Sequence, residues 1–206
     1  MASLQPILVK NLSSTILRQI GAVLSRAFMN DPMYLYLQPD PARRAAFSPG
    51  WMTTLARYGM RYAQLHVTPD PIRGISIWMP PGAAEPGAFE MIRCGILGSL
   101  AGIVWHSLVQ MLPLTRQWEA LRRQQPPHWY LWLLGVDPDS QGQGIGSALM
   151  QPGLQSADRD RLPCYLETMT ERDVAFYQKR GFEIVFEGCI PSGAPFWTMK
   201  RLVTNL

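Results

Sequence analysis

The sequence predicts a protein of the α/β class, or more strictly α+β, in which helices flank a central mixed sheet. A near-continuous apolar run at Trp129–Val136 is typical of a buried central strand. From that run to the C-terminus, helix-like and strand-like segments alternate, with a glycine-rich loop after the first strand. The chain of 206 residues has the length of one domain with a substantial core, so we expect a single domain over 1–206.

The first half of the chain predicts helices with a few short strands. In chain order we expect a short strand at 7–9, a helix from Ser13 or Ser14 to about Met29, an aromatic-rich loop at 30–41, a helix at 41–64 with a break near Pro49, and two strands at 65–68 and 74–79 joined by a turn. A helical insertion over about 86–124 then precedes the central strand.

The second half predicts two further helices and three further strands. They are a helix from Gly144, a strand at 164–167, a helix at 171–180 that Gly181 ends, and closing strands at 182–186 and 196–200. Pro152 lies about two turns into the first of these helices. Because proline lacks an N–H donor, we expect it to kink or end that helix.

Composition and charge exclude several classes of function. Charged residues make up 17% of the chain, the net charge is +4, and the basic residues are scattered, so nothing indicates a nucleic-acid partner. The three cysteines form no CxxC pair, and the three histidines share no metal-ligand spacing. We therefore expect a cytoplasmic protein with no disulfide framework and no metal site.

One segment without charged residues, 94–115, reaches the minimum length of a membrane span. Its three glycines, together with His106, Gln110 and Pro113, argue against that interpretation. We expect a buried or pocket-lining helix there, with an in-plane membrane contact as the lesser alternative. The N-terminus has no basic stretch followed by an apolar core, so it does not read as a signal peptide.

The glycine-rich loop QGQGIG, 141–146, is the most informative motif. A helix N-terminus binds phosphate well when glycines let the anion approach its free N–H groups. The loop has no lysine, which excludes a mononucleotide P-loop. A dinucleotide fingerprint is weak, because Ser147 stands where its third glycine belongs and 137–141 separate the strand from the first glycine. The remaining pattern, Q-x-x-G-x-G, places successive N–H groups around a pyrophosphate.

This loop and its neighbours resemble the GNAT (GCN5-related N-acetyltransferase) superfamily, which binds acetyl-coenzyme A through a (R/Q)-x-x-G-x-(G/A) loop. GVDPDSQGQGIGSALM is similar to the fourth strand, loop and helix of that family, LPCYLET to the fifth strand, and VAFYQKRGFEIV to the helix and strand that follow. The agreement in order and spacing covers 129–201. YLET, FY, GF and the closing PFWTMKR are most similar to the branch that includes puromycin N-acetyltransferase.

The resemblance implies a GNAT-like fold in which the fourth and fifth strands splay apart to admit the pantetheine arm. It implies acetyl-CoA as cosubstrate and no metal. The coenzyme-binding residues that it implies are Gly135, Val136, Gln141, Gly142, Gln143, Gly144, Ile145, Gly146, Ser147 and Thr170. Gly135 is consistent with a bulge at the end of its strand, or with a simple strand-end glycine.

Two candidate catalytic residues follow from the same resemblance. Tyr177 matches the tyrosine that protonates the departing thiolate, and its alternative role is packing beside Phe176. Glu167, at the end of the fifth strand, is the candidate base that removes the amine proton. Its alternative role is a structural carboxylate that binds backbone or an arginine such as Arg172.

The acceptor reaches the thioester from the N-terminal half, whose segments are rich in aromatic residues and methionine. We expect loop aromatics within 30–36 to line the pocket, and a small apolar or aromatic primary amine to be the acceptor. The predicted activity is acetyl transfer from acetyl-CoA to that amine, and the alternative is a non-catalytic acyl-CoA sensor on the same fold. The sequence leaves a homodimer open.

Overall fold

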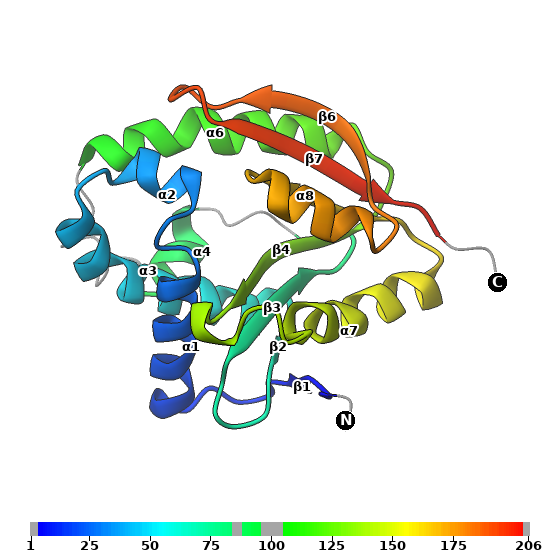
Figure 1. The fold of residues 1–206 in the computed structure, drawn as a ribbon, viewed down its shortest axis with the longest axis horizontal. Coiled ribbons are helices and arrows are strands. Elements are labelled where there is room, and N and C mark those ends of the chain that lie inside the picture. The colour runs from blue at the N-terminus through cyan, green and yellow to red at the C-terminus, as the bar shows by residue number, and fades with distance from the viewer. Residues whose placement is uncertain (1–3, 84–87, 96–104, 204–206) are drawn as a thin grey trace.

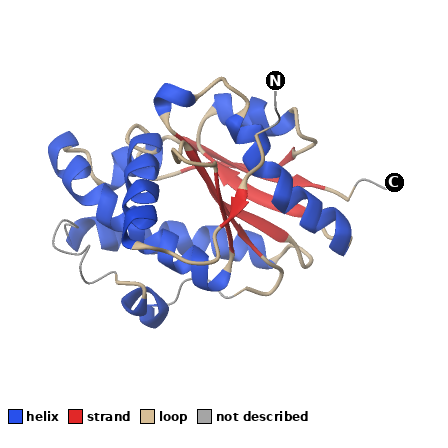
Figure 2. Ribbon diagram, turned by 90° about the horizontal axis from the view of Figure 1, so that it is seen from below, coloured by secondary structure: helices blue, strands red, loops and turns tan. Residues whose placement is uncertain are grey.

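The computed structural model describes residues 4–83, 88–95 and 105–203, and it confirms the predicted mixed α/β architecture. One seven-stranded sheet has the order β1-β2-β3-β4-β5-β7-β6, with helices on both faces (Figure 1, Figure 2). The strands are β1 (Ile7–Leu8), β2 (Gln64–Val67), β3 (Gly74–Met79), β4 (Trp129–Val136), β5 (Cys164–Thr168), β6 (Glu183–Cys189) and β7 (Pro195–Arg201).

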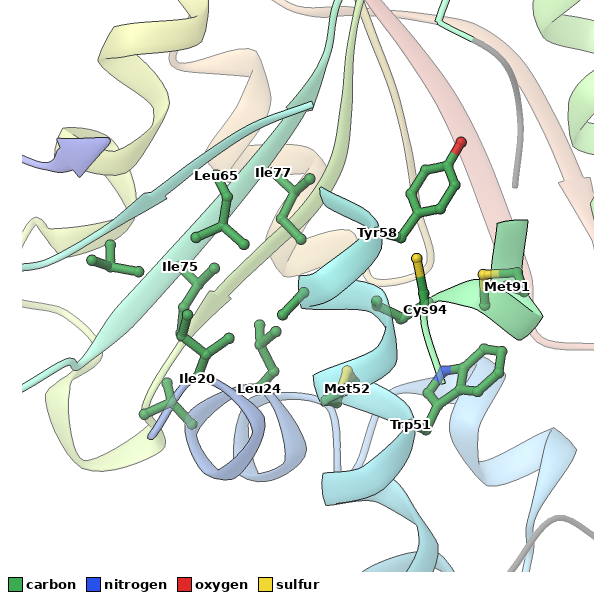
Figure 3. Close-up of a cluster of buried hydrophobic side chains, with 14 of the residues drawn as sticks. Ile20, Leu24, Trp51, Met52, Tyr58, Leu65, Ile75, Ile77, Met91 and Cys94 are labelled. Atoms are coloured by element: carbon green, nitrogen blue, oxygen red, sulfur yellow. The ribbon is translucent and has the colours of Figure 1, made fainter. Parts of the chain in front are cut away.

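The described helices divide between the two faces. They are α1 (Ser14–Ala27), α2 (Pro32–Leu37), α3 (Pro41–Tyr62), α4 (Ala88–Arg93), α6 (Trp105–Arg123), α7 (Ile145–Asp160) and α8 (Glu171–Gln178). Side chains of α1 and α3 pack on β2 and β3 in the first core cluster (Figure 3). Side chains of α6 pack on the same face further along, against Phe196 of β7. Trp197 and Met199 of β7 point the other way, into the cluster under α7 and α8.

The centre of the sheet contains its one parallel pair among the described strands. β4 and β5 pair only at Trp129 with Cys164 and at Tyr130 with Tyr165. Beyond these pairs, β4 continues beside β3 while β5 continues beside β7, so the two strands part. The predicted splay of the fourth and fifth strands is therefore present in the fold.

A bulge lies in β4, but not at Gly135. Ile77 pairs with Leu133 and Trp78 with Leu131, which leaves Trp132 as the extra residue. Gly135 is instead needed for close packing, because a Cβ atom there would lie 2.7 Å from Leu24 Cδ2 of α1. The sequence suggested a bulge or a simple strand end at Gly135. Neither explanation includes this contact with α1, which lies more than a hundred residues earlier in the chain.

The expected loop at 30–41 is wrong in its first part, where the chain forms α2. The Asp31 carboxylate accepts a hydrogen bond from the Met33 amide at 2.9 Å, and Pro32 takes the first helical position. An aspartate N-cap followed by proline is a strong helix-start signal. Tyr34 of this helix is only 3% exposed and accepts a hydrogen bond from Trp51 Nε1 at 3.0 Å. It belongs to the core, not to a pocket wall.

Asp31 gives a testable pH dependence of stability. Burial, as the main cause, raises its pKa from 3.8 to about 6, so the folded state binds this proton more tightly than the unfolded state. The contribution of Asp31 to stability therefore falls as the pH rises from about 4 to about 6, by up to roughly 2 kcal/mol. We expect Asp31→Asn, which keeps the N-cap, to remove this decline in urea unfolding curves measured across that range.

The matched control is Asp40→Asn, which changes the equivalent N-cap of α3, where the carboxylate accepts from the Arg43 amide at 2.8 Å. Asp40 is exposed, and because Asp31 is unchanged in this variant, the decline between about pH 4 and pH 6 should remain. Equal profiles for both variants would assign the pH dependence to other groups.

Neither proline ends its helix, so the predicted break near Pro49 and the predicted helix end at Pro152 are wrong. α3 runs from Pro41 to Tyr62 through Pro49, and α7 runs to Asp160 through Pro152. Tertiary packing explains the second case, because Gly153 lies against the buried indole of Trp78 and holds this stretch of α7 on the sheet. The packing outweighs the one hydrogen bond that proline removes.

A methyl group at Gly153 should destabilise the fold strongly. A Cβ atom there would overlap the Trp78 ring, which is fully buried. We expect Gly153→Ala to lower the free energy of unfolding by about 2 kcal/mol, since overpacking outweighs the gain in helix propensity. Chemical denaturation tests this, with Gln155→Ala on the exposed side of the same helix as the control, expected within about 0.5 kcal/mol of wild type. Similar values for both variants would contradict the overlap.

The insertion predicted at 86–124 is helical where the structure describes it, in α4 and α6. Part of the uncharged segment 94–115 lies outside the described residues. In its described part, Leu114 is 2% exposed while Val109 and Leu112 are about half exposed, so α6 buries only one side. Among the helices in the described ranges, none has the length and apolarity needed to cross a bilayer.

Candidate functional site

The loop after β4 presents free N–H groups to an open space. Gly142 and Gly144 have φ values of 77° and 79°, a region that side chains other than glycine rarely adopt. A Cβ atom at either position would meet nothing within 4 Å among the described atoms, so both face open space. Gly144 is the N-cap of α7 and supplies no side-chain cap. The first amides of α7 are therefore available to an anion.

Side chains on the far side of the splay hold this loop in place. The Gln141 amide donates to the Val136 carbonyl at 3.2 Å and accepts from Arg172 Nη2 of α8 at 2.9 Å. Arg180, just after α8, donates to Ser147 Oγ, and its guanidinium lies 3.5 Å from the Phe176 ring centroid. The sequence did not single out Arg180, because its contact with Ser147 joins residues that are distant in the chain.

Thr170 begins the helix on that far side. Its hydroxyl accepts a hydrogen bond from the Asp173 amide at 3.1 Å and donates to the Asp173 carboxylate at 2.7 Å. This is the capping arrangement that the T-x-x-D spacing predicts. The hydroxyl thus already makes two hydrogen bonds to Asp173. A contact between Thr170 and a coenzyme would have to leave these bonds in place or replace them.

Tyr177 lies one to two turns further along α8 and is 8% exposed. Its ring packs edge-on against Phe176 and Phe182, with centroid distances of 5.2 Å and 5.8 Å. Burial, helped by the charge of Asp173, raises the pKa of Tyr177 well above its usual value. The phenol therefore stays protonated at neutral pH and retains the proton that an acid must donate.

Glu167 lies on β5, beyond the point where β4 and β5 part. If the register of Tyr130 with Tyr165 is continued, Glu167 comes opposite Trp132, the bulged residue of β4. Burial raises the pKa of Glu167, against the opposing effects of Arg122 and Tyr130. The arginine beside Glu167 is not Arg172, as the sequence suggested, because Arg172 donates to Gln141. Arg122 of α6 lies there instead, with its Nη1 3.7 Å from Glu167 Oε1.

A cavity of about 440 Å³ opens beside this carboxylate, between the end of β3, the end of α6 and the start of β4. Its lining is mostly apolar and aromatic, with two arginines and a histidine: Met79, Pro80, Gly82, Ala83, Arg122, Arg123, Gln125, Pro126, Pro127, His128, Tyr130 and Trp132. The aromatic side chains come from β4 and not from 30–36 as expected. Tyr130 and Trp132 share a face because they lie two residues apart in the strand, and the bulge brings Leu133 to that face as well.

No group of histidine, cysteine and acidic side chains able to hold a metal ion occurs among the described residues. The polar groups of the site are thus a carboxylate, two phenols, arginines and backbone amides. Such a set suits proton transfer and anion binding.

Comparisons with known proteins agree with this geometry. Residues 93–182 match the model of the acetyltransferase (GNAT) family. The chain is 27% identical to an uncharacterised N-acetyltransferase of Schizosaccharomyces pombe, over 80% of this chain and 70% of the relative. A Corynebacterium glutamicum structure described as histone acetyltransferase HPA2 and related acetyltransferase superposes with a TM-score of 0.63, at 22% identity and 98% coverage of both chains. Arylalkylamine N-acetyltransferase 2 from Aedes aegypti superposes with a TM-score of 0.62, at 15% identity, covering 98% of this chain and all of the other.

Proposed function

Because this chain belongs to the GNAT superfamily of acetyl-CoA-dependent N-acetyltransferases, we propose that it acetylates the primary amine of a small apolar or aromatic molecule. The observation that carries the proposal is the parting of β4 and β5 directly before the glycine loop. We infer that a donor arm runs through this gap from the anion-binding amides toward the cavity lined by Tyr130 and Trp132.

The residues present fit the coenzyme, which supplies an acetyl thioester when bound. We assign its pyrophosphate to the amides of 141–146, with Ser147 beside them, because these amides face open space and carry the positive end of α7. The backbone of Gly135 and Val136 borders the splay and is assigned to the pantetheine arm. The bond from Gln141 to the Val136 carbonyl would have to yield to such a contact.

The acid of the proposed mechanism is Tyr177. A thioester that reacts with an amine expels a thiolate, which leaves more easily as a thiol. The buried phenol of Tyr177 holds its proton at neutral pH, as this role requires. Its packing against Phe176 and Phe182 fixes the ring, so the packing role and the acid role support each other.

The base of the proposed mechanism is Glu167. Burial raises the pKa of its carboxyl, which makes the carboxylate a stronger proton acceptor. Its position opposite the bulge of β4 brings it to the level where the strands have parted. The ion pair with Arg122 supports the structural role considered for Glu167, with a different arginine from the expected one.

The acceptor class follows from the cavity. Of the residues that line it, none is acidic, so it offers no complement to a lysine-rich peptide. Its aromatic and proline surfaces suit a flat apolar body. Aryl and arylalkyl primary amines are the first compounds to test. The similarity to the puromycin N-acetyltransferase branch, the cytoplasmic location and a homodimer stay predictions.

The experiment is a thiol-release assay with acetyl-CoA and a panel of acceptors. We expect arylalkyl amines to give the highest kcat/KM and a basic peptide to give almost none. Preference for the basic peptide would overturn the acceptor class while leaving acetyl transfer in place. Binding of acetyl-CoA without thiol release from any acceptor would instead favour an acyl-CoA sensor.

A further inference from the structure

Tyr130 is the residue that joins the cavity to Glu167. It lines the cavity, and it occupies the last β4 position that still pairs with β5. Its ring and the Glu167 carboxylate both lie against the Arg122 guanidinium, and the charge of Glu167 raises the pKa of Tyr130. Glu167 itself is not part of the cavity lining. A molecule in the cavity therefore meets the tyrosine before it meets the carboxylate.

The carboxylate has unused capacity to accept a proton. Glu167 Oε1 is buried and has no hydrogen-bond partner within the described part of the chain, although Arg122 Nη1 lies 3.7 Å away. This oxygen is shielded from solvent, and because Glu167 does not line the cavity, a molecule bound there has no direct contact with the carboxylate. A proton that leaves the acceptor needs an intermediate group, and Tyr130 stands between them.

Arg122 fixes the geometry of this pair. Its guanidinium carbon lies 4.3 Å from the Tyr130 ring centroid while its Nη1 faces Glu167. The Arg122 side chain is 12% exposed and that of Glu167 is 10% exposed, so the contacts are made out of water. A cation stacked on the ring and beside the carboxylate holds both groups in one orientation and favours the charged carboxylate.

We propose that Tyr130 is a further catalytic residue, which relays the proton of the acceptor amine to Glu167. The inference rests on the proposed function, specifically on Glu167 as the base. The acceptor binds as an ammonium ion, and its N–H proton passes to Tyr130 Oη. The phenolic proton passes at the same time to the Glu167 carboxylate, which becomes a neutral carboxylic acid. The electron pair left on the nitrogen then forms the bond to the thioester carbonyl carbon. Arg122 acts as a positioning residue for both.

A concerted relay agrees with the environment of Tyr130. Burial and the charge of Glu167 raise its pKa well above the usual value, so a free phenolate would be costly. Transfer of both protons together avoids that species. The neighbouring Tyr165 does not share this position, because it is outside the cavity lining.

The test compares Tyr130→Phe, Glu167→Gln and the double variant, with Tyr165→Phe as the matched control. Thiol release is followed at neutral pH with phenethylamine, an alkylammonium acceptor, and with aniline, which is already neutral. We expect Tyr130→Phe and Glu167→Gln each to lower kcat/KM for phenethylamine by about 100-fold or more, and to lower it much less for aniline. The double variant should be little worse than either single variant, because the two residues act in series.

Each contrary outcome has a separate meaning. If Glu167→Gln is impaired while Tyr130→Phe behaves like Tyr165→Phe, the relay is overturned and the base assignment stands. If Glu167→Gln is unimpaired, the base assignment fails and the relay with it. The wild-type enzyme in mixtures of light and heavy water gives a second readout. Two protons moving together give a curved dependence of kcat on deuterium content, and a straight line would overturn the relay.

Discussion

Replacing Tyr177 by phenylalanine is expected to lower kcat about 100-fold to 1,000-fold, with little change in the KM for acetyl-CoA. The substitution removes only the hydroxyl, so the ring contacts with Phe176 and Phe182 remain and the fold should persist. The expected loss reflects a thiolate that must leave without receiving a proton. Steady-state thiol release with a saturating arylalkyl amine measures it.

The control for Tyr177 is Tyr58→Phe, which removes the hydroxyl of another buried tyrosine, in α3, in the core under the opposite face of the sheet. Its kcat should stay near the wild-type value at a temperature where both variants are folded. Unchanged turnover in Tyr177→Phe would assign this residue to packing alone, and another proton donor would then have to be sought.

A valine at position 144 is expected to raise the KM for acetyl-CoA by about 10-fold to 100-fold, equivalent to roughly 1.4–2.7 kcal/mol of lost binding. Gly144 has a φ of 79°, which a β-branched residue adopts only with strain. Its side chain would also project into the open space before the amides of α7. The variant should use S-acetyl-N-acetylcysteamine as well as the wild type does, because this short thioester has no pyrophosphate.

The matched control for Gly144→Val is Gly193→Val. Gly193 lies in the turn between β6 and β7, has a φ of 85° and also faces open space, so the backbone strain is comparable. We expect Gly193→Val to lose stability without any change in the KM for acetyl-CoA. Equal effects of both variants on that KM would mean that strain, and not the anion site, explains the loss at position 144.

Local patterns in the sequence were sufficient for much of the fold. The T-x-x-D spacing at Thr170 predicts the cap that the structure has, and the apolar run at Trp129–Val136 predicts the central strand. The same holds for the glycine loop, since φ values near 80° are a property of Gly142 and Gly144 themselves. In each case the pattern that predicts the element lies within a few residues of the sequence.

Predictions failed where distant residues decide the conformation. Pro152 does not end α7, because the adjacent Gly153 packs on Trp78 from another part of the chain. The role of Gly135 depends on Leu24, and the partner of Glu167 is Arg122 in the helical insertion. Sequence spacing carries no record of such contacts, so Tyr130 and Trp132 read only as buried strand residues.

The short pairing between β4 and β5 couples folding stability to ligand binding. Two residue pairs join the four strands on one side of the sheet to the three on the other. The backbone groups of β4 and β5 past these pairs lack each other as hydrogen-bond partners, so side-chain packing carries most of the connection. A ligand that bonds to the backbone of both strands would complete the sheet, and its binding energy would appear directly as resistance to unfolding. The gap proposed to admit the donor is thus also the point at which the donor would stabilise the protein.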